Sequence, residues 1–169
     1  RVRLLIDQLA AVREEDSLAG LGAMHAKFEL RVYNPVLDRA RLPLPMYAVA
    51  GACCWRQLNR RMHNKLLLVD DMLGVTGGRN YQDDYYDWDA EYNFRDRDVL
   101  VAGPAAQDMA RNFEAFWSAR RSVPAERLND VGRTLLRGGV PPMPPQNYLR
   151  PKRVAGLLAE VEDADTVQQ

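Results

Sequence analysis

Two short strand-like runs near the start of the chain constrain its fold most strongly. Residues 4–6 are a continuous apolar run that ends at Asp7, and apolar and charged residues alternate from Phe28 to Val32. The stretch between them has helical apolar spacing in parts, interrupted by glycines. A strand, a helical connection and a second strand predict a parallel pair, because parallel neighbours need a long crossover. We therefore expect an α/β fold with a mixed, largely parallel sheet flanked by helices.

Three further elements are predicted downstream. Apolar runs at 66–69 and 73–76 flank the turn signal Asp70-Asp71, which indicates a hairpin, and residues 99–101 form another buried strand. Met109, Phe113 and the pair 116–117 follow the spacing of an amphipathic helix. Residues 36–52 follow Pro35 and contain Pro43 and Pro45, so we expect mainly loop there, with a short helical turn.

The expected organisation is one folded unit over residues 1–122 and a linker or tail over 123–169. Residues 141–145 read Pro-Pro-Met-Pro-Pro, which is typical of extended chain, and the last residues are acidic and polar. The chain of 169 residues starts directly on a strand and without methionine. We therefore expect a piece of a longer protein, incomplete at its N-terminus.

Composition excludes several classes of protein. Lys plus Arg and Asp plus Glu both number 23, and this balance weakens the case for a dedicated nucleic-acid binder. The adjacent Cys53 and Cys54 cannot build a disulfide framework and lack metal-ligand spacing, so we expect half-buried thiols. No apolar run approaches the ~20 residues of a membrane span, and no signal peptide is visible.

A histidine and a lysine stand two positions apart at the start of the predicted hairpin. His63 and Lys65 therefore project to the same face, where the ammonium disfavours a second positive charge and leaves the imidazole a neutral nucleophile. The lysine can also hold a phosphoryl oxygen. Gly77 and Gly78 allow the backbone to approach an anion, and Asn80 adds an amide donor. This set predicts a phosphate-binding pocket that contains a nucleophile.

The same residues resemble the motif of the phospholipase D superfamily. His63-Asn64-Lys65, four residues, Asp70, six residues and Gly77-Gly78-Arg79-Asn80 match its spacing. Residues 1–7, 28–35 and 94–104 and the predicted helix at 109–117 are similar to the bacterial cardiolipin-synthase-like branch. The resemblance covers about residues 1–120, and it implies that residues 1–122 form a phospholipase D-like catalytic half-domain.

The resemblance also implies roles for these residues. His63 would attack phosphorus and form a phosphohistidine, while Lys65 and Asn80 would hold the non-bridging oxygens. Asp70 would support the hairpin, and Asp96 would accept a hydrogen bond from the histidine, as a carboxylate that fixes the imidazole tautomer does. The chemistry implied needs neither a metal nor another cofactor.

Two further positions bear on these roles: one is an alternative partner for the histidine, and the other departs from the commonest form of the motif. Asp98 lies on the same strand face as Asp96 and is a weaker candidate for the histidine partner. Gly78 stands where many members of the superfamily have serine, so a hydroxyl contact is unavailable there.

The family's active site needs two such motifs, whereas this chain carries one. Its other histidine, in His25-Ala26-Lys27, is followed by Val32 where an aspartate is required and by no glycine pair. The second half-site could lie on the same longer chain, which we favour, or on the partner in a homodimer.

The resemblance implies phosphatidyl transfer in cardiolipin synthesis, with a phosphatidylglycerol-like substrate and a membrane surface as partners. The expected location is peripheral, at the cytoplasmic face of a bacterial inner membrane. A phosphodiesterase or nuclease active as a homodimer is an alternative, for which the basic residues Arg56, Arg60, Arg61 and Lys65 would suit a nucleic-acid backbone. The zero net charge makes nucleic acid the less favoured partner. An inactive folding or interaction module is the third possibility.

Overall fold

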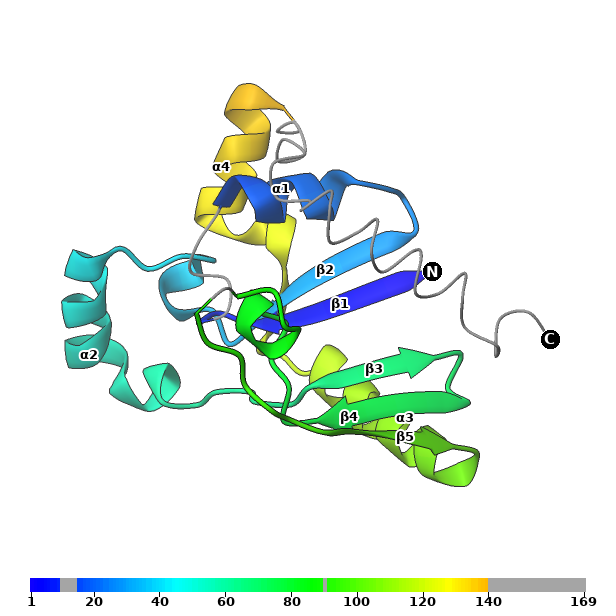
Figure 1. Cartoon of the computed structure of the whole chain (residues 1–169). Coiled ribbons are helices and arrows are strands. Elements are labelled where there is room, and N and C mark those ends of the chain that lie inside the picture. Colours follow the sequence, from blue (N-terminus) through cyan, green and yellow to red (C-terminus); the bar gives the residue numbers. More distant parts are fainter. Residues whose placement is uncertain (10–14, 90, 140–169) are drawn as a thin grey trace.

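The structure, a computed structural model, describes residues 1–9, 15–89 and 91–139. The elements along the described residues are β1 (Val2–Asp7), α1 (Glu15–Ala23), β2 (Phe28–Tyr33), η1 (Val36–Asp38), α2 (Leu44–Leu58), β3 (Leu66–Val69), β4 (Leu73–Gly77), η2 (Asp83–Tyr85), β5 (Asp98–Ala102), α3 (Pro104–Trp117), β6 (Ser122–Pro124), η3 (Ala125–Arg127) and α4 (Asn129–Gly138). The strands form two three-stranded sheets, in the orders β1-β2-β6 and β3-β4-β5 (Figure 1).

The first sheet is built around the predicted parallel pair. β1 runs parallel to β2 with Val2 opposite Phe28, and β6 adds antiparallel to β2. Alternate residues point to opposite faces of a strand. One face of this sheet meets α1, η3 and α4 in the main core, whose buried members are Leu18, Ala19, Leu30, Val32, Ala40, Ala125, Leu128 and Val131.

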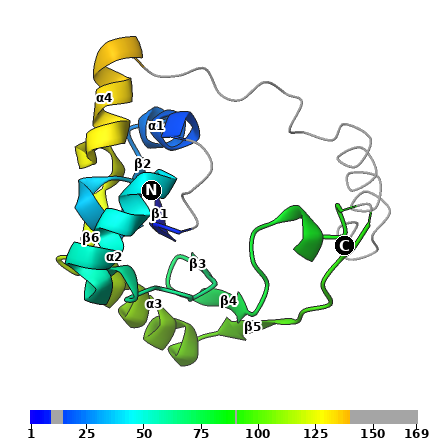
Figure 2. The ribbon, with the colours of Figure 1, turned by 90° about the vertical axis from the view of Figure 1, so that its left-hand side faces the viewer.

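The opposite face of the first sheet holds α3. The Arg3 guanidinium lies 5.3 Å from the ring centre of Trp117 and pairs with Glu114 at 2.6 Å. Arg31 lies 4.5 Å from the same ring centre and donates to the Trp117 carbonyl oxygen at 2.8 Å. Because α3 also covers β3, β4 and β5, it joins the two sheets (Figure 2).

The second sheet contains the predicted hairpin. β3 and β4 are antiparallel, with Leu66 opposite Thr76 and Val69 opposite Leu73. Asp70 and Asp71 in the turn have φ values of 49° and 57°. Aspartate tolerates this left-handed region better than most residues, and such turns match the twist of a hairpin. The prediction of a hairpin with its turn at these aspartates is confirmed.

The α/β class with flanking helices is confirmed, and the balance of strand directions differs from the expectation. Among the described strands only β1 and β2 pair in parallel. The reason is that β3 and β4 are joined by a tight turn, and β5 and β6 also return antiparallel to a neighbouring strand. The predicted strand at 99–101 and the helix at 109–117 are present as β5 and α3. The strand is not buried as expected, because Val99 and Leu100 are exposed.

Residues 36–52, expected to be mainly loop, include most of the 15-residue helix α2, so that expectation is wrong. Pro43 precedes the helix and Pro45 lies in its first turn, where a missing N–H breaks no helical hydrogen bond. Cys53 and Cys54, expected to be thiols, are joined in a disulfide. Cys54 has non-helical φ and ψ values of −134° and 28°, which interrupt the helix there.

The segment after residue 122 differs from the expected linker up to residue 138. β6 pairs with β2, and α4 packs against α1. Asp130 anchors α4, because its side chain accepts hydrogen bonds from the Ala40 and Arg41 backbone N–H groups at 2.9 Å each. The expected proline-rich linker and acidic tail beyond lie outside the described residues. None of the described helices is both long and apolar enough to cross a membrane.

Candidate active site

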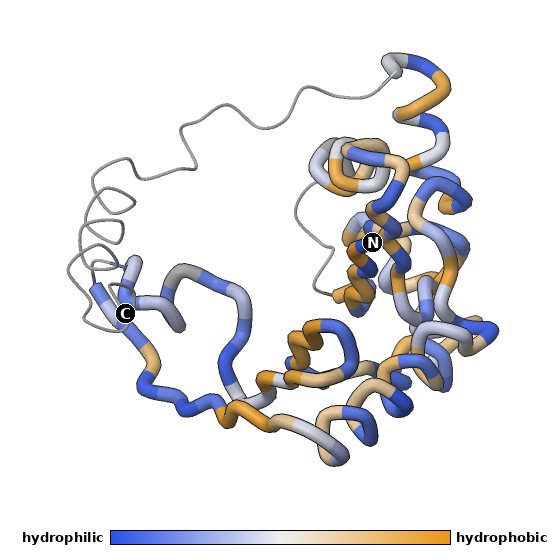
Figure 3. The backbone as a smooth tube through the Cα atoms, turned by 90° about the vertical axis from the view of Figure 1, so that its right-hand side faces the viewer, coloured by the Kyte–Doolittle hydropathy of each residue, from blue (hydrophilic) through white to orange (hydrophobic). Residues whose placement is uncertain are grey.

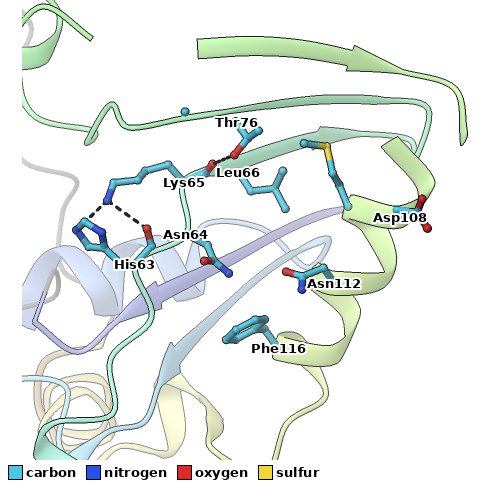
Figure 4. A pocket seen from close by; sticks show the side chains of 10 residues that line it. His63, Asn64, Lys65, Leu66, Thr76, Asp108, Asn112 and Phe116 are labelled. Carbon is cyan, nitrogen blue, oxygen red and sulfur yellow. Dashed lines mark hydrogen bonds between the residues drawn. The ribbon is translucent and has the colours of Figure 1, made fainter. Parts of the chain in front are cut away.

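His63 and Lys65 lie side by side in the segment that leads into β3. Lys65 Nζ is 2.8 Å from His63 Nε2 and also donates to the His63 carbonyl oxygen at 3.2 Å (Figure 4). An ammonium has no acceptor, so Nε2 must be the unprotonated, accepting nitrogen of the ring. The imidazole proton therefore resides on Nδ1. The Lys65 carbonyl oxygen accepts from the Thr76 hydroxyl at 2.8 Å, which ties this segment to β4.

An open hollow of about 690 Å³ surrounds this pair. His63 and Lys65 lie at one end, and Asn64, Asn112 and Phe116 lie toward α3 (Figure 4). The hollow thus has a cationic, hydrogen-bonding end beside a mixed amide and apolar wall. Its lining residues are His63, Asn64, Lys65, Leu66, Thr76, Gly77, Asp108, Met109, Asn112 and Phe116.

A buried carboxylate at the end of β1 fixes the residue before His63. Asp7 is 8% exposed, and its Oδ2 accepts from the Met62 backbone N–H at 2.9 Å. Its Oδ1 accepts from the Leu9 backbone N–H at 2.9 Å and lies 3.4 Å from Arg61 Nη1. A charged acceptor with backbone N–H partners holds its geometry well, because such bonds are about twice as strong as neutral ones. Asp7 therefore positions the start of the His63 segment relative to the first sheet.

Asn34 fixes the same segment one turn earlier. It is 1% exposed, has a φ of 52°, and donates from Nδ2 to the Gln57 and Arg60 carbonyl oxygens at 2.7 and 2.8 Å. The Gln57 carbonyl group lies in the last turn of α2, where helical partners run out, and that of Arg60 lies two residues beyond the helix. Asn34 thereby sets where α2 ends and where the chain turns toward His63.

The two glycines of the motif leave room for two aspartates. A Cβ on Gly77 would lie 2.5 Å from the Arg97 carbonyl oxygen and would also overlap the Asp98 carboxylate. A Cβ on Gly78 would lie 2.5 Å from Asp96 Oδ2. Gly77 is therefore required by the backbone at residues 97–98, whereas a side chain at position 78 would require only the Asp96 carboxylate to turn.

Arg79 organises the start of the loop between β4 and β5. Its Nε lies 3.1 Å from Asp98 Oδ2, its Nη2 donates to the Asp96 carbonyl oxygen at 2.9 Å, and its guanidinium lies 5.4 Å from the ring centre of Tyr86. Burial raises the pKa of Tyr86, and the nearby Tyr81 adds to the shift while the charge of Arg79 opposes it. The remainder of this loop is mainly hydrophilic (Figure 3).

The predicted site residues Asp70, Asn80 and Asp96 are not among those that line the hollow around His63 and Lys65. Asp70 is in the turn at the far end of β3 and is exposed. Asn80 is partly buried after β4, outside the lining of the hollow, and its carbonyl oxygen accepts from Gln82 N–H at 3.0 Å. The Asp96 carboxylate accepts from the Arg97 backbone N–H at 2.8 Å, and no hydrogen bond joins it to His63 within the described part of the chain.

Among the predicted phosphate-binding residues, Gly77 lines the hollow with Lys65, and Gly78 faces Asp96. The sequence reasoning did not assign Asn64, Asp108 or Asn112 to the site. The i, i+4 spacing of Asp108 and Asn112 marks a polar stripe on α3, and this signal could have placed them together. The described ranges contain no group of three or more His, Cys, Asp or Glu residues that could hold a metal ion.

Comparison with known proteins finds bacterial cardiolipin synthases among the similar sequences. The chain is 36% identical over 131 residues to cardiolipin synthase C of Escherichia coli, and this aligned region covers 78% of this chain and 26% of that protein. An uncharacterized protein of Helicobacter pylori is 32% identical over 128 residues, covering 76% of this chain and 25% of that protein. Cardiolipin synthase A of Pseudomonas fluorescens is 38% identical over 71 residues, 40% of this chain and 15% of that protein.

No family model matches the chain. The chain spans about a quarter of the length of the first relatives it matches. The matches are long enough to extend well beyond any single short motif. Over about three quarters of its length, the chain is thus similar in sequence to a bacterial cardiolipin synthase, in agreement with a cardiolipin-synthase-like relationship.

Proposed function

We propose that this chain supplies one half-site of a phosphatidyltransferase that acts through a phosphohistidine on His63. The observation that carries the proposal is the contact of 2.8 Å between Lys65 Nζ and His63 Nε2. It presents an unprotonated ring nitrogen and a cation at one point of an open hollow. The similarity to cardiolipin synthases supports a phospholipid as the substrate.

In the first step, a phosphodiester oxygen takes the place of His63 Nε2 as the acceptor for Lys65 Nζ. The freed Nε2 lone pair attacks phosphorus, and the bond from phosphorus to the leaving alcohol oxygen breaks. Lys65 and the Asn80 amide balance the charge that builds on the non-bridging oxygens. Backbone N–H groups at Gly77 and Gly78 complete the phosphate-binding set.

In the second step, the hydroxyl group of an acceptor lipid attacks the phosphohistidine. A new P–O bond forms, the P–N bond breaks, and His63 returns to its neutral state, while the hydroxyl proton passes to the group that protonated the leaving alcohol in the first step. With phosphatidylglycerol as donor and acceptor, the products are cardiolipin and glycerol. We assign Asp96 as the carboxylate that accepts a hydrogen bond from the Nδ1–H group of His63 in the complete site, and Asp70 as a support of the hairpin.

The leaving alcohol needs a proton, which we assign to a second His-x-Lys motif. That motif belongs to a longer chain or to a homodimer partner. The proposed location is the membrane surface, at the cytoplasmic face of a bacterial inner membrane. A nuclease on the same scaffold is the alternative that the experiment must separate.

The test is covalent trapping with phosphatidyl-4-nitrophenol labelled at its phosphate, presented to the purified 169-residue chain in detergent micelles. Because nitrophenolate leaves without being protonated, this trapping step does not need the second motif. We expect an acid-labile label on the protein that is absent in His63→Asn. His25→Asn is the matched control, because His25 is the only other histidine and should leave labelling unchanged. Persistence of the label in His63→Asn, or cleavage of single-stranded DNA without any lipid labelling, would contradict the proposal.

A further inference from the structure

Helix α2 is apolar on both of its sides, although only one side is covered by the protein. Its inward side chains, Met46, Tyr47, Ala50, Cys54 and Leu58, pack with Val36, Leu37 and Leu42 in a small second core. On the outward side, Leu44 is 86%, Val49 55% and Trp55 63% exposed. A helix that is hydrophobic all round is normally covered on all sides. The outward face of α2, defined by Leu44, Val49 and Trp55, therefore requires a partner.

The position of α2 leaves this face accessible. The helix lies at the edge of the molecule, away from both sheets, and faces the viewer in Figure 2. Its main neighbour among the described elements is η1. His63 follows the last residue of α2 by only five positions, so the chain leads from this helix directly into the segment that carries the candidate site.

The charge around α2 is of one sign. Residues 39–69 contain no Asp or Glu, and their basic residues are Arg39, Arg41, Arg56, Arg60, Arg61 and Lys65. Arg41, Arg56 and Arg60 are exposed, and none of them forms an ion pair with another described residue. The exposed apolar face thus has unpaired arginines at both of its ends, although the whole chain has no net charge.

An anionic bilayer surface matches both properties. Apolar side chains and tryptophan partition into the boundary between headgroups and acyl chains, and arginines at the same level are attracted by anionic headgroups. A nucleic-acid backbone would satisfy the arginines but would leave Leu44 and Val49 without a function. We propose that the outward face of α2 is a membrane-docking surface, which inserts Leu44, Val49 and Trp55 at the headgroup level of a bilayer containing anionic phospholipid.

The docking proposal rests on the proposed function only in the choice of phospholipid as the partner, because binding to a bilayer requires no catalysis. The test is co-sedimentation of the 169-residue chain with vesicles of phosphatidylcholine alone or mixed equally with phosphatidylglycerol. We expect binding to the mixed vesicles and weaker binding to phosphatidylcholine, with a loss at high salt. Trp55 fluorescence should be quenched by lipids brominated in their acyl chains, measured against Trp55→Phe to subtract the other tryptophans.

Two pairs of matched variants assign the effect to α2. Val49→Asp should abolish binding, while Leu136→Asp, at a 90% exposed position on α4, should leave it unchanged. Arg56→Gln with Arg60→Gln should weaken binding about 25-fold at low salt, at about fivefold (about 1 kcal/mol) for each arginine near an anionic surface. The control pair on α4, exposed Arg133→Gln with Arg137→Gln, should have little effect. The melting temperature of each variant verifies folding.

Several outcomes would overturn the docking proposal. They are no vesicle binding by the unchanged chain, equal losses in the α2 and α4 variants, or a folded Val49→Asp that binds as before. A change of oligomeric mass in Val49→Asp without an effect on vesicles would assign the face to a second copy. Equal affinity for single-stranded DNA, lost in the same variants, would assign it to nucleic acid. Because lipid labelling is measured in micelles, it can succeed while vesicle binding fails, so the two proposals fail separately.

Discussion

Replacing Asp130 by alanine should destabilise the whole fold, although Asp130 lies far along the chain from the motif. Its side chain is 1% exposed. Oδ1 accepts from the backbone N–H groups of Ala40 at 2.9 Å and Val131 at 3.1 Å, Oδ2 accepts from Arg41 N–H at 2.9 Å, and Arg39 Nε lies 3.9 Å away. The carboxylate thus joins α4 to the segment that precedes α2.

The magnitude follows from the groups that lose their acceptor. Ala40 is fully buried, so its N–H cannot turn to water in the Asp130→Ala variant. An unsatisfied buried donor costs about 1–3 kcal/mol, and loss of a bond to a charged acceptor costs about 1.5–3 kcal/mol. Together we expect the free energy of unfolding to fall by about 3–5 kcal/mol, a large share of the ~5–15 kcal/mol that is typical of a domain.

The assay is equilibrium unfolding in urea, followed by far-UV circular dichroism. Asp108→Ala is the control, because the Asp108 side chain is 68% exposed and, among the described residues, its ion pair is with Arg111 on the surface of α3. That change should stay within about 0.5 kcal/mol. If Asp130→Ala is also within about 1 kcal/mol of the original chain, residues 122–138 do not belong to the cooperative fold and our description of α4 is incorrect.

Three further outcomes can be checked on the same chain. The first is measured by nitrogen NMR shifts at about pH 8, where imidazole is neutral. The ring proton should be on Nδ1 in His63, because Nε2 contacts Lys65, and on Nε2 in His25, because its Nδ1 accepts from a backbone N–H at 3.0 Å. Identical tautomers in the two histidines would contradict the Lys65 contact. Gly77→Ala should lower the free energy of unfolding by about 1–3 kcal/mol, because the β5 backbone must move, and an unchanged melting temperature would refute this. The hydrogen bond from Arg3 lowers the pKa of Glu114 below 4.5, so the stabilisation by this pair is present above pH 4.5 and is lost as the pH falls through the lowered pKa. The free energy of unfolding of Glu114→Gln should therefore approach that of the original chain in acid. A difference that stays constant with pH would argue against the pair.

Local patterns in the sequence predicted the elements that depend on local interactions. The alternation before Asn34 and the aspartates at the hairpin turn determine β2 and the β3–β4 pair, because side-chain direction and turn geometry are set by neighbouring residues. The proximity of His63 and Lys65 is local in the same way, since two positions of extended chain share a face. These parts could be predicted without knowledge of the tertiary structure.

The parts that sequence reasoning missed depend on distant contacts. Pro45 resembles a helix breaker until its position in the first turn of α2 is known. The packing of α4 depends on Asp130 meeting the backbone at residues 40–41, some 90 positions earlier. The relation of Asp96 to His63 depends on the path of residues 78–97, for which no local rule exists. The support of Met62 by Asp7 likewise joins residues 55 positions apart.

The contact between Gly78 and Asp96 has a consequence for how this site can diverge. A side chain at position 78 and the present position of the Asp96 carboxylate exclude each other, so a larger residue at position 78 requires this carboxylate to turn away. In homologues with serine at this position, we expect the carboxylate to turn elsewhere or to be replaced. Aligned sequences should therefore show covariation of the two positions, and in this chain a change at Asp96 should compensate part of the cost of Gly78→Ser.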